Sequence, residues 1–259
     1  MINILFPNVS GRAFSVLLRH RDVFKKMLKT QLIPPFLDPL FYLLGMGYGL
    51  GAMIRDIEGY SYVEFIAPAL VASAMMTAPS YECGIGGYVR LYYQKTWDAM
   101  IATPLSIEDV VTGEILYGIS RALLQTTAIL IVIVLFGLVK SPLAIFVPFV
   151  CVLGGAMFGS IALSYISRIP NINYIDYYFT LVMTPMFIFA GTFFPVTQLP
   201  EWAQKAAFFM PLYHVVLVTR SFVTGDIHPD LWQSIVWIII VGAFFFGLSL
   251  RLIRSRVMH

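Results

Sequence analysis

The sequence predicts an all-α membrane protein with six transmembrane helices, an N-terminal interfacial helix and a re-entrant helical hairpin before the last span. Of the 259 residues, 59% are hydrophobic and 12% are charged, whereas soluble domains carry about 25% charged residues. Apolar runs long enough to cross a bilayer recur along the chain. No polar block is long enough to fold separately, so we expect residues 1–259 to form a single membrane domain.

Segment 10–28 has the pattern of an amphipathic helix, and we expect it to lie on the membrane surface. Its apolar side chains fall near one face: Phe14, Leu17, Leu18, Phe24 and Leu28. Its basic side chains lie largely elsewhere: Arg12, Arg19, Lys25 and Lys26. Arg21 falls inside the apolar stripe, from which its long side chain can reach out. A soluble docking helix is the alternative interpretation.

Six apolar segments are predicted to cross the bilayer, because a hydrocarbon core about 30 Å thick needs about 20 apolar residues. They are 32–54, 62–89, 110–138, 143–165, 177–194 and 231–253. Pro79 and the three glycines between 84 and 87 predict a kinked, partly unwound end of the second segment. Gly155 and Gly159 predict close helix packing in the fourth.

Three charged residues fall inside or beside these spans: Glu82, Glu114 and Arg121. A charged arginine there costs about 2.5–3.5 kcal/mol on insertion scales, so Arg121 is expected to face protein or water. Glu114 precedes it by roughly two turns, or about 10 Å, which disfavours a direct pair, and Glu82 is an equally plausible partner. Glu82 is either a functional charge facing a cavity or an interfacial residue that is leaving the lipid.

The polar segment 94–104 is predicted to form a short helix between the second and third spans. Thr96 is expected to cap it and Pro104 to end it. Ser106, followed by Glu108 and Asp109, then opens the next long helix, because acidic side chains are favoured in a first turn. Trp97 and Asp98 suit docking into a cleft of a partner protein, and an ordinary loop helix is the alternative.

Segment 195–229 is rich in apolar residues but is broken too often by proline to cross the membrane as one helix. We expect short helices after Pro200 and after the break at Pro211, with Gly225 as a left-handed cap. Backbone of this kind must pack on protein. We predict an outer gate that includes Phe193, Phe194, Trp202, Phe208, Phe209, Tyr213 and His214. A static aromatic plug is the alternative.

Basic residues predict that both termini are cytoplasmic, because the inner side of a membrane protein carries an excess of lysine and arginine. That topology leaves only four basic residues outside: Arg55, Lys140, Lys205 and Arg220. It places segment 94–104 in the cytoplasm and segment 195–229 on the far side. The expected location is the bacterial inner (plasma) membrane.

Other classes of protein receive little support from the sequence. No G-x-x-x-x-G-K-[ST] motif occurs, so the chain cannot cradle nucleotide phosphates in the usual way. The four histidines lie on segments assigned to opposite sides, which argues against an intramembrane enzyme. Cys83 and Cys151 have no metal-ligand spacing, and we expect neither a metal nor a cofactor on this chain. A passive channel would need a ring of polar side chains lining a pore.

Three blocks of sequence resemble a known family, the type-2 ABC exporter permeases. They read FIAPALVASAMM from Phe65, KTWDAMIATPLS with GEIL from Gly113, and FFPVTQLPEW from Phe193, which continues into MPLYHVV at Met210. Within that family the chain is most similar to the nodulation-factor, or lipo-oligosaccharide, exporter branch. Ala69 departs from that branch, which has glycine after the proline.

The resemblance implies a homodimer joined to two separate ATPase subunits, which would bind ATP and Mg²⁺. The cargo would be an amphipathic glycolipid or lipo-oligosaccharide, with hydrophobic drug efflux as the alternative, and nucleic acid is not an expected partner. The segment after the second span would be the coupling helix that contacts the ATPase. Its residues are Thr96, Trp97, Asp98, Ala99, Met100 and Thr103. The paired short helices before the last span match 201–224.

Overall fold

The computed structural model describes residues 9–26, 33, 37, 40–54, 56–57 and 59–257. Within these ranges the chain is helical and has no strand, apart from an isolated antiparallel bridge between Ile57 and Tyr60. The all-α prediction is therefore confirmed for the described part of the chain. Leu28, Arg55 and most of the first half of segment 32–54 lie outside it, and the remainder of that segment includes the π-helix η1 (Leu43–Leu50).

Helix α3 (Tyr62–Tyr81) is the centre of the bundle. Ser61 and Glu64 form a capping box at its start. The helix continues through the wider π-helical turns η2 (Glu82–Gly86) and η3 (Val89–Tyr93), giving a helical segment of 32 residues. The predicted unwinding near Gly84 is wrong, because wider turns keep the backbone hydrogen-bonded where an unwound strand would leave polar groups exposed to lipid.

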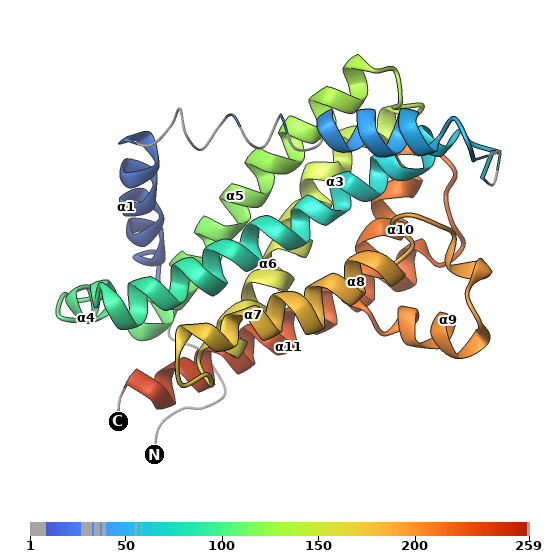
Figure 1. The fold of residues 1–259 in the computed structure, drawn as a ribbon. Helices are drawn as coiled ribbons and strands as arrows, with labels where there is room; N and C mark the ends of the chain where they lie inside the picture. Colours follow the sequence, from blue (N-terminus) through green and yellow to red (C-terminus); the bar gives the residue numbers. More distant parts are fainter. Residues whose placement is uncertain are drawn as a thin grey trace.

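Helices α5 (Ile107–Leu135) and α6 (Val147–Ile166) pack beside α3, and α11 (Leu231–Val257) packs along α6 (Figure 1). The turn η4 (Pro142–Phe146) leads into α6. In its most apolar stretch α3 is 83% buried, against 17% for α11, so α11 covers the flank of the bundle. A Cβ built on Gly155 would lie 3.4 Å from the Ile119 Cα, which supports close packing at that glycine.

Four of the described helical segments are long and apolar enough to span a membrane, or five if α9 and α10 form one broken span. The predicted fifth span, 177–194, is not among them. Its region folds as one unbroken helical run whose hydrogen-bonding pattern changes along its length: η5 (Ile172–Tyr174), α7 (Ile175–Tyr177), η6 (Tyr178–Met183) and α8 (Thr184–Phe189). The run ends just before Gly191, whose φ of +81° takes the chain out of the helix.

The two ends of the bundle carry different short helices (Figure 1). One end holds α1 (Ala13–Lys26), α4 (Thr96–Ile101) and the last turns of α11. The other holds α9 (Glu201–Phe208) and α10 (Pro211–Thr224), which meet at 84° after the turn η7 (Val196–Gln198). Proline at the first position of α10 and Gly225 at its left-handed cap, with φ of +90°, confirm the predicted punctuation.

Candidate functional site

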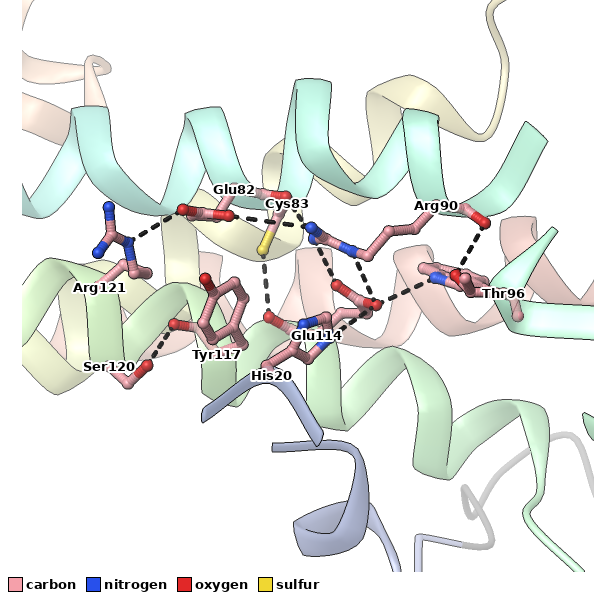
Figure 2. Close-up of polar contacts among 10 residues, drawn as sticks. His20, Glu82, Cys83, Arg90, Thr96, Glu114, Tyr117, Ser120 and Arg121 are labelled. Atoms are coloured by element: carbon pink, nitrogen blue, oxygen red, sulfur yellow. Dashed lines mark hydrogen bonds and ion pairs between the residues drawn. The ribbon is translucent and has the colours of Figure 1, made fainter. Parts of the chain in front are cut away.

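Glu114 on α5 is the centre of a buried polar cluster beneath α4 (Figure 2). Its side chain is completely buried. Arg90 of η3 binds it with two hydrogen bonds, from Nε to Oε1 at 3.1 Å and from Nη2 to Oε2 at 2.6 Å. This two-pronged geometry is the strongest form of a charge-assisted bond and fixes the carboxylate in the ionised state.

Two further side chains bind the same carboxylate oxygen. The Trp97 indole donates from Nε1 to Oε1 of Glu114 at 3.0 Å, and His20 Nε2 lies 3.1 Å from that atom. An ionised carboxylate only accepts hydrogen bonds, so His20 carries a proton on Nε2. Glu114 thus joins α1, η3 and α4 to α5.

The second ion pair of the cluster links Arg121 on α5 to Glu82 on η2, with Nε 3.0 Å from Oε1. Glu82 also lies 3.9 Å from Arg90, so the charges alternate from Arg121 through Glu82 and Arg90 to Glu114. The expectation that Arg121 has an acidic partner is confirmed, and Glu82 is that partner. Glu82 therefore neutralises a charge within the protein, although its side chain remains 22% exposed.

Arg90 is the functional residue that sequence reasoning missed. The distribution of basic residues in the sequence assigns Arg90 to the inner side of the membrane and gives it no partner. Its signal is its spacing from Glu82, because residues eight apart on an α-helix differ in direction by only about 80° and can lie on one broad face. Its Nη2 also donates to the Glu82 carbonyl oxygen at 2.7 Å, across the wide turns of η2.

Helix α1 is seated on the first half of α5 by a close contact. A Cβ built on Gly113 would lie 2.4 Å from the Val16 Cβ, so only glycine permits this approach. The His20 ring stacks on Tyr117 at 4.3 Å. The backbone N–H and the hydroxyl of Ser10 bind Asp109 at 2.6 and 3.0 Å.

Asp109 also completes a capping box with Ser106, which confirms the predicted start of α5. The predicted cap of α4 at Thr96 is wrong. The residue before the helix is Lys95, which reverses the chain in a left-handed conformation with φ of 50°. This reversal brings Thr96 back towards the end of η3, where its hydroxyl donates to the Arg90 carbonyl oxygen at 3.1 Å.

At the opposite end of the molecule, His214 fastens α10 to its surroundings. It is fully buried, with Nε2 at 2.7 Å from the Phe208 carbonyl oxygen and Nδ1 at 3.0 Å from the Ser234 hydroxyl. Its ring stacks on Trp237 at 4.3 Å. These contacts hold α10 against α11, so His214 has a structural role in this conformation.

The remaining predicted gate residues differ in exposure: four are half-buried and two are exposed. Phe208 packs near Phe209 and Tyr213, with ring centroids 5.9 and 6.3 Å away, while Phe193 packs at 5.0 Å on Phe187 of α8. Trp202 and Phe209 are about three-quarters exposed, at 74% and 72%. Phe193, Phe194, Phe208 and Tyr213 are half-buried.

The C-terminal end of α10 is bonded to the loops around it. Tyr60, just ahead of α3, donates its hydroxyl to Asp226, which follows α10. Only the neutral phenol can donate in this way, so the bond raises the pKa of Tyr60. The Arg220 guanidinium lies 4.0 Å over the Phe65 ring and donates to the Gly191 carbonyl oxygen at 2.8 Å.

A family model described as ABC-2 type transporter matches residues 12–224. The chain belongs to the ABC-2 type transporter family. Nodulation protein J of Rhizobium meliloti strain 1021 is 34% identical over 242 residues, which cover 93% of this chain and 92% of that protein. Nodulation protein J of Rhizobium leguminosarum bv. trifolii is 33% identical over 98% of this chain and 97% of its own length. The inner membrane transport permease YadH of Escherichia coli K12 is 22% identical over 74% and 75%, respectively.

As an ABC-2 permease, the chain is an integral membrane transport subunit, and permeases of this family pair with an ABC ATPase subunit. The two faces of α4 have different surroundings. Trp97 and Met100 are buried against the permease, whereas Asp98, Ala99 and Thr103 are exposed. The prediction that the Trp97 indole enters a cleft of the partner is wrong, because that side chain is fully buried on Glu114.

Proposed function

We propose that this chain is the membrane subunit of an ATP-driven exporter that moves an amphipathic lipo-oligosaccharide or related glycolipid out of the cytoplasm. The main support for this cargo is the similarity to two Nodulation protein J sequences over more than nine-tenths of the chain. The name of the E. coli relative, an inner membrane transport permease, supports a location in the bacterial inner membrane.

The observation that carries the mechanism is the attachment of α4 to Glu114. A helix of six residues is too short to be stable alone, so its position depends on its contacts. Trp97 binds the carboxylate that Arg90 and His20 also bind. A displacement of α4 by an ATPase would therefore act on α1, η3 and α5 together.

The outward face of α4 is the proposed contact with the ATPase. Asp98 and Ala99 on that face, and Thr103 in the turn after it, are exposed and small, which permits a partner backbone to approach closely. The family resemblance further suggests two ATPase subunits and a homodimer of this chain, with six spans in each copy. Nucleotide and Mg²⁺ would then be held by the ATPase.

A cytoplasmic location of both termini is supported by the charges around α4. Arg254, near the end of α11, pairs with Glu108 at the start of α5 at 2.9 Å, so these segments share one end of the bundle. The elements at that end and the turns beside them carry most of the described basic residues: Arg12, Arg19, Arg21, Lys25, Lys26, Arg90, Lys95, Arg168, Arg251, Arg254 and Arg256. At the opposite end, Lys205 lies on α9 and Arg220 on α10, and the backbone of Lys140 bonds to Val223 of α10.

The hairpin 195–229 is the proposed outer gate, with α9 as its moving part. Helix α10 is anchored through His214 and through the contacts beyond Thr224. Helix α9 carries the exposed Trp202 and is followed at the break by the exposed Phe209. Rotation at Met210 would swing these aromatic side chains aside while α10 stays in place.

A reconstituted transport assay tests the proposal. The permease and its ABC ATPase are placed in liposomes, and ATP-dependent transfer of a labelled acylated oligosaccharide is measured beside transfer of a hydrophobic dye. We expect saccharide transfer that requires ATP and is not inhibited by the dye. Transfer of the dye alone would favour drug efflux, and ion flux without the ATPase would favour a channel.

A further inference from the structure

A cavity of about 390 Å³ lies between α1 and the middle of α5. Leu17 and Leu18 of α1 and Leu124 of α5 form much of its apolar wall. Arg21 and Arg121 also line it, and none of its lining residues is acidic. The cavity therefore combines an apolar surface with two guanidinium groups, whose paired carboxylates, Asp22 and Glu82, do not line it.

Neither arginine is fully satisfied by its neighbours. Arg121 uses Nε to bind Glu82, but its Nη1 is buried and has no hydrogen-bond partner among the described residues. Arg21 bonds to the adjacent Asp22 at 2.9 Å, where both side chains are more than half exposed. Exposed pairs of this kind contribute little, so Arg21 can exchange Asp22 for a stronger anion.

We propose that this cavity binds one anionic phospholipid, with its phosphate between Arg21 and Arg121 and an acyl chain along Leu124. Guanidinium groups bind phosphate oxygens through paired hydrogen bonds. Basic pockets between membrane helices on the cytoplasmic side bind anionic head groups. The cavity is formed with α1, which lies at the end of the bundle that carries α4, so the proposed orientation assigns it to the cytoplasmic half of the membrane.

The two charges also select among lipids. A zwitterionic head group brings a quaternary ammonium towards two guanidinium groups, whereas phosphatidylglycerol brings a net negative charge and no cation. A soluble anion has the charge but cannot cover the apolar wall. The site therefore selects an anionic lipid over both a zwitterionic lipid and inorganic phosphate.

Native mass spectrometry of the detergent-solubilised permease measures the binding directly and needs neither the ATPase nor transport. Phosphatidylglycerol or phosphatidylcholine is titrated into the protein. We expect one phosphatidylglycerol to bind at least about tenfold more tightly than phosphatidylcholine, since each basic residue contributes about 1 kcal/mol to binding an anionic lipid surface. Inorganic phosphate at millimolar concentration should not displace it.

Three variants locate the site. Arg21→Gln should weaken phosphatidylglycerol binding about fivefold, the loss that corresponds to one basic residue. Arg19→Gln is the matched control, because Arg19 is an exposed arginine on the same helix that does not line the cavity, and its binding should stay unchanged. Leu17→Trp keeps both arginines but fills the cavity, and it should abolish the selective binding while the thermal unfolding temperature of the protein confirms folding.

Equal binding of the two lipids by the unmodified protein would overturn the proposal. So would an equal loss in Arg19→Gln and Arg21→Gln, which would indicate attraction to the surface of α1 as a whole. Displacement of the lipid by inorganic phosphate would identify a site for soluble anions instead. Full selective binding by a folded Leu17→Trp protein would place the lipid outside the cavity.

Discussion

Glu114 makes more polar contacts than its position in the sequence suggests. A buried carboxylate is costly unless it is paired and hydrogen-bonded. Here four hydrogen bonds from three side chains offset that cost. The bonds come from three different segments, α1, η3 and α4, so one residue couples local chemistry to helix placement.

Glu114→Gln tests this role while nearly preserving the volume of the side chain. The neutral amide keeps one acceptor oxygen, places an NH₂ donor against at least one of the surrounding donors, and leaves Arg90 buried without its carboxylate. We expect a loss of about 3–5 kcal/mol in the free energy of unfolding, as for other broken buried pairs. Thermal unfolding in detergent measures it.

The matched control for that change is Glu64→Gln, which alters a part-exposed pair with Lys140. Glutamine still supports the capping box at Ser61, and the pair itself contributes at most about 1 kcal/mol. If the two variants lost equal stability, the special position of Glu114 would be refuted.

Arg121 and Glu82 offer a second test at the level of residues. Arg121→Ala leaves Glu82 with only the distant Arg90, and Glu82→Ala leaves a buried guanidinium unpaired. We expect the double variant to lose less folded yield than the sum of the single variants. Arg121→Ala combined with Glu108→Ala should be additive, because Glu108 pairs with Arg254. Additive losses in both pairs would contradict the assigned partner.

At the scale of elements, α4 combines a buried fastening side with an exposed side. Trp97 and Met100 hold the helix, and Asp98 lies on the outer face. The helix is so short that its position cannot be separated from these contacts. The attachment of α4 to the permease and its proposed contact with the ATPase can therefore be altered independently by single substitutions on its two sides.

Trp97→Phe should reduce transport while the ATPase still co-purifies with the permease. The substitution keeps an aromatic ring but removes the hydrogen bond to a buried carboxylate, which costs about 1–3 kcal/mol. Asp98→Ala should have the opposite effect, weakening co-purification without lowering the unfolding temperature. Loss of the ATPase in Trp97→Phe, with normal co-purification in Asp98→Ala, would reverse the assignment of the two faces.

At the scale of the whole molecule, the outer hairpin is the place where a conformational change is easiest to trap. Ala207 is completely buried, so a crosslink between copies has to be made elsewhere. Phe209 is exposed at the break between α9 and α10. A cysteine there samples the proposed moving part directly.

Phe209→Cys is tested in a background without Cys83 and Cys151. In the proposed homodimer, oxidation should link two copies and stop transport, and reduction should restore it, because a locked α9 cannot move aside. Ile240→Cys on the exposed flank of α11 is the control and should transport normally after oxidation. Undiminished export through a crosslinked Phe209→Cys dimer would leave only a static plug.

Much of the fold could be predicted because local chemistry determines it. Ser106 with Asp109 opens α5, and Gly225 closes α10, as their side chains or backbone freedom require. That Trp97 faces the permease could not be predicted, because a helix of six residues has fewer than two turns and shows no hydrophobic periodicity. The wide turns after α3 were missed for a related reason. Glycine weakens a helix, but only tertiary packing decides whether it unwinds or widens.

The pairing of charges was predictable only in kind. Sequence position could require an acidic partner for Arg121 but could not choose between Glu82 and Glu114, since helix rotation and packing set that choice. The number of spans could not be predicted from composition for the same reason. Segment 177–194 has the composition of a span, yet its helix includes the π-helical stretch η6 and already ends at Phe189.

The seat of α1 on α5 has a consequence for synthesis of the protein. His20 leaves the ribosome 94 residues before Glu114, and Ser10 leaves it 99 residues before Asp109. During that interval the partners of α1 do not yet exist, so its apolar stripe must remain on the membrane surface or on an insertion factor. The helix can dock only after the first half of α5 has been made. Helix α1 is therefore translated well before α5 but cannot reach its final position until the third of the predicted spans is in place.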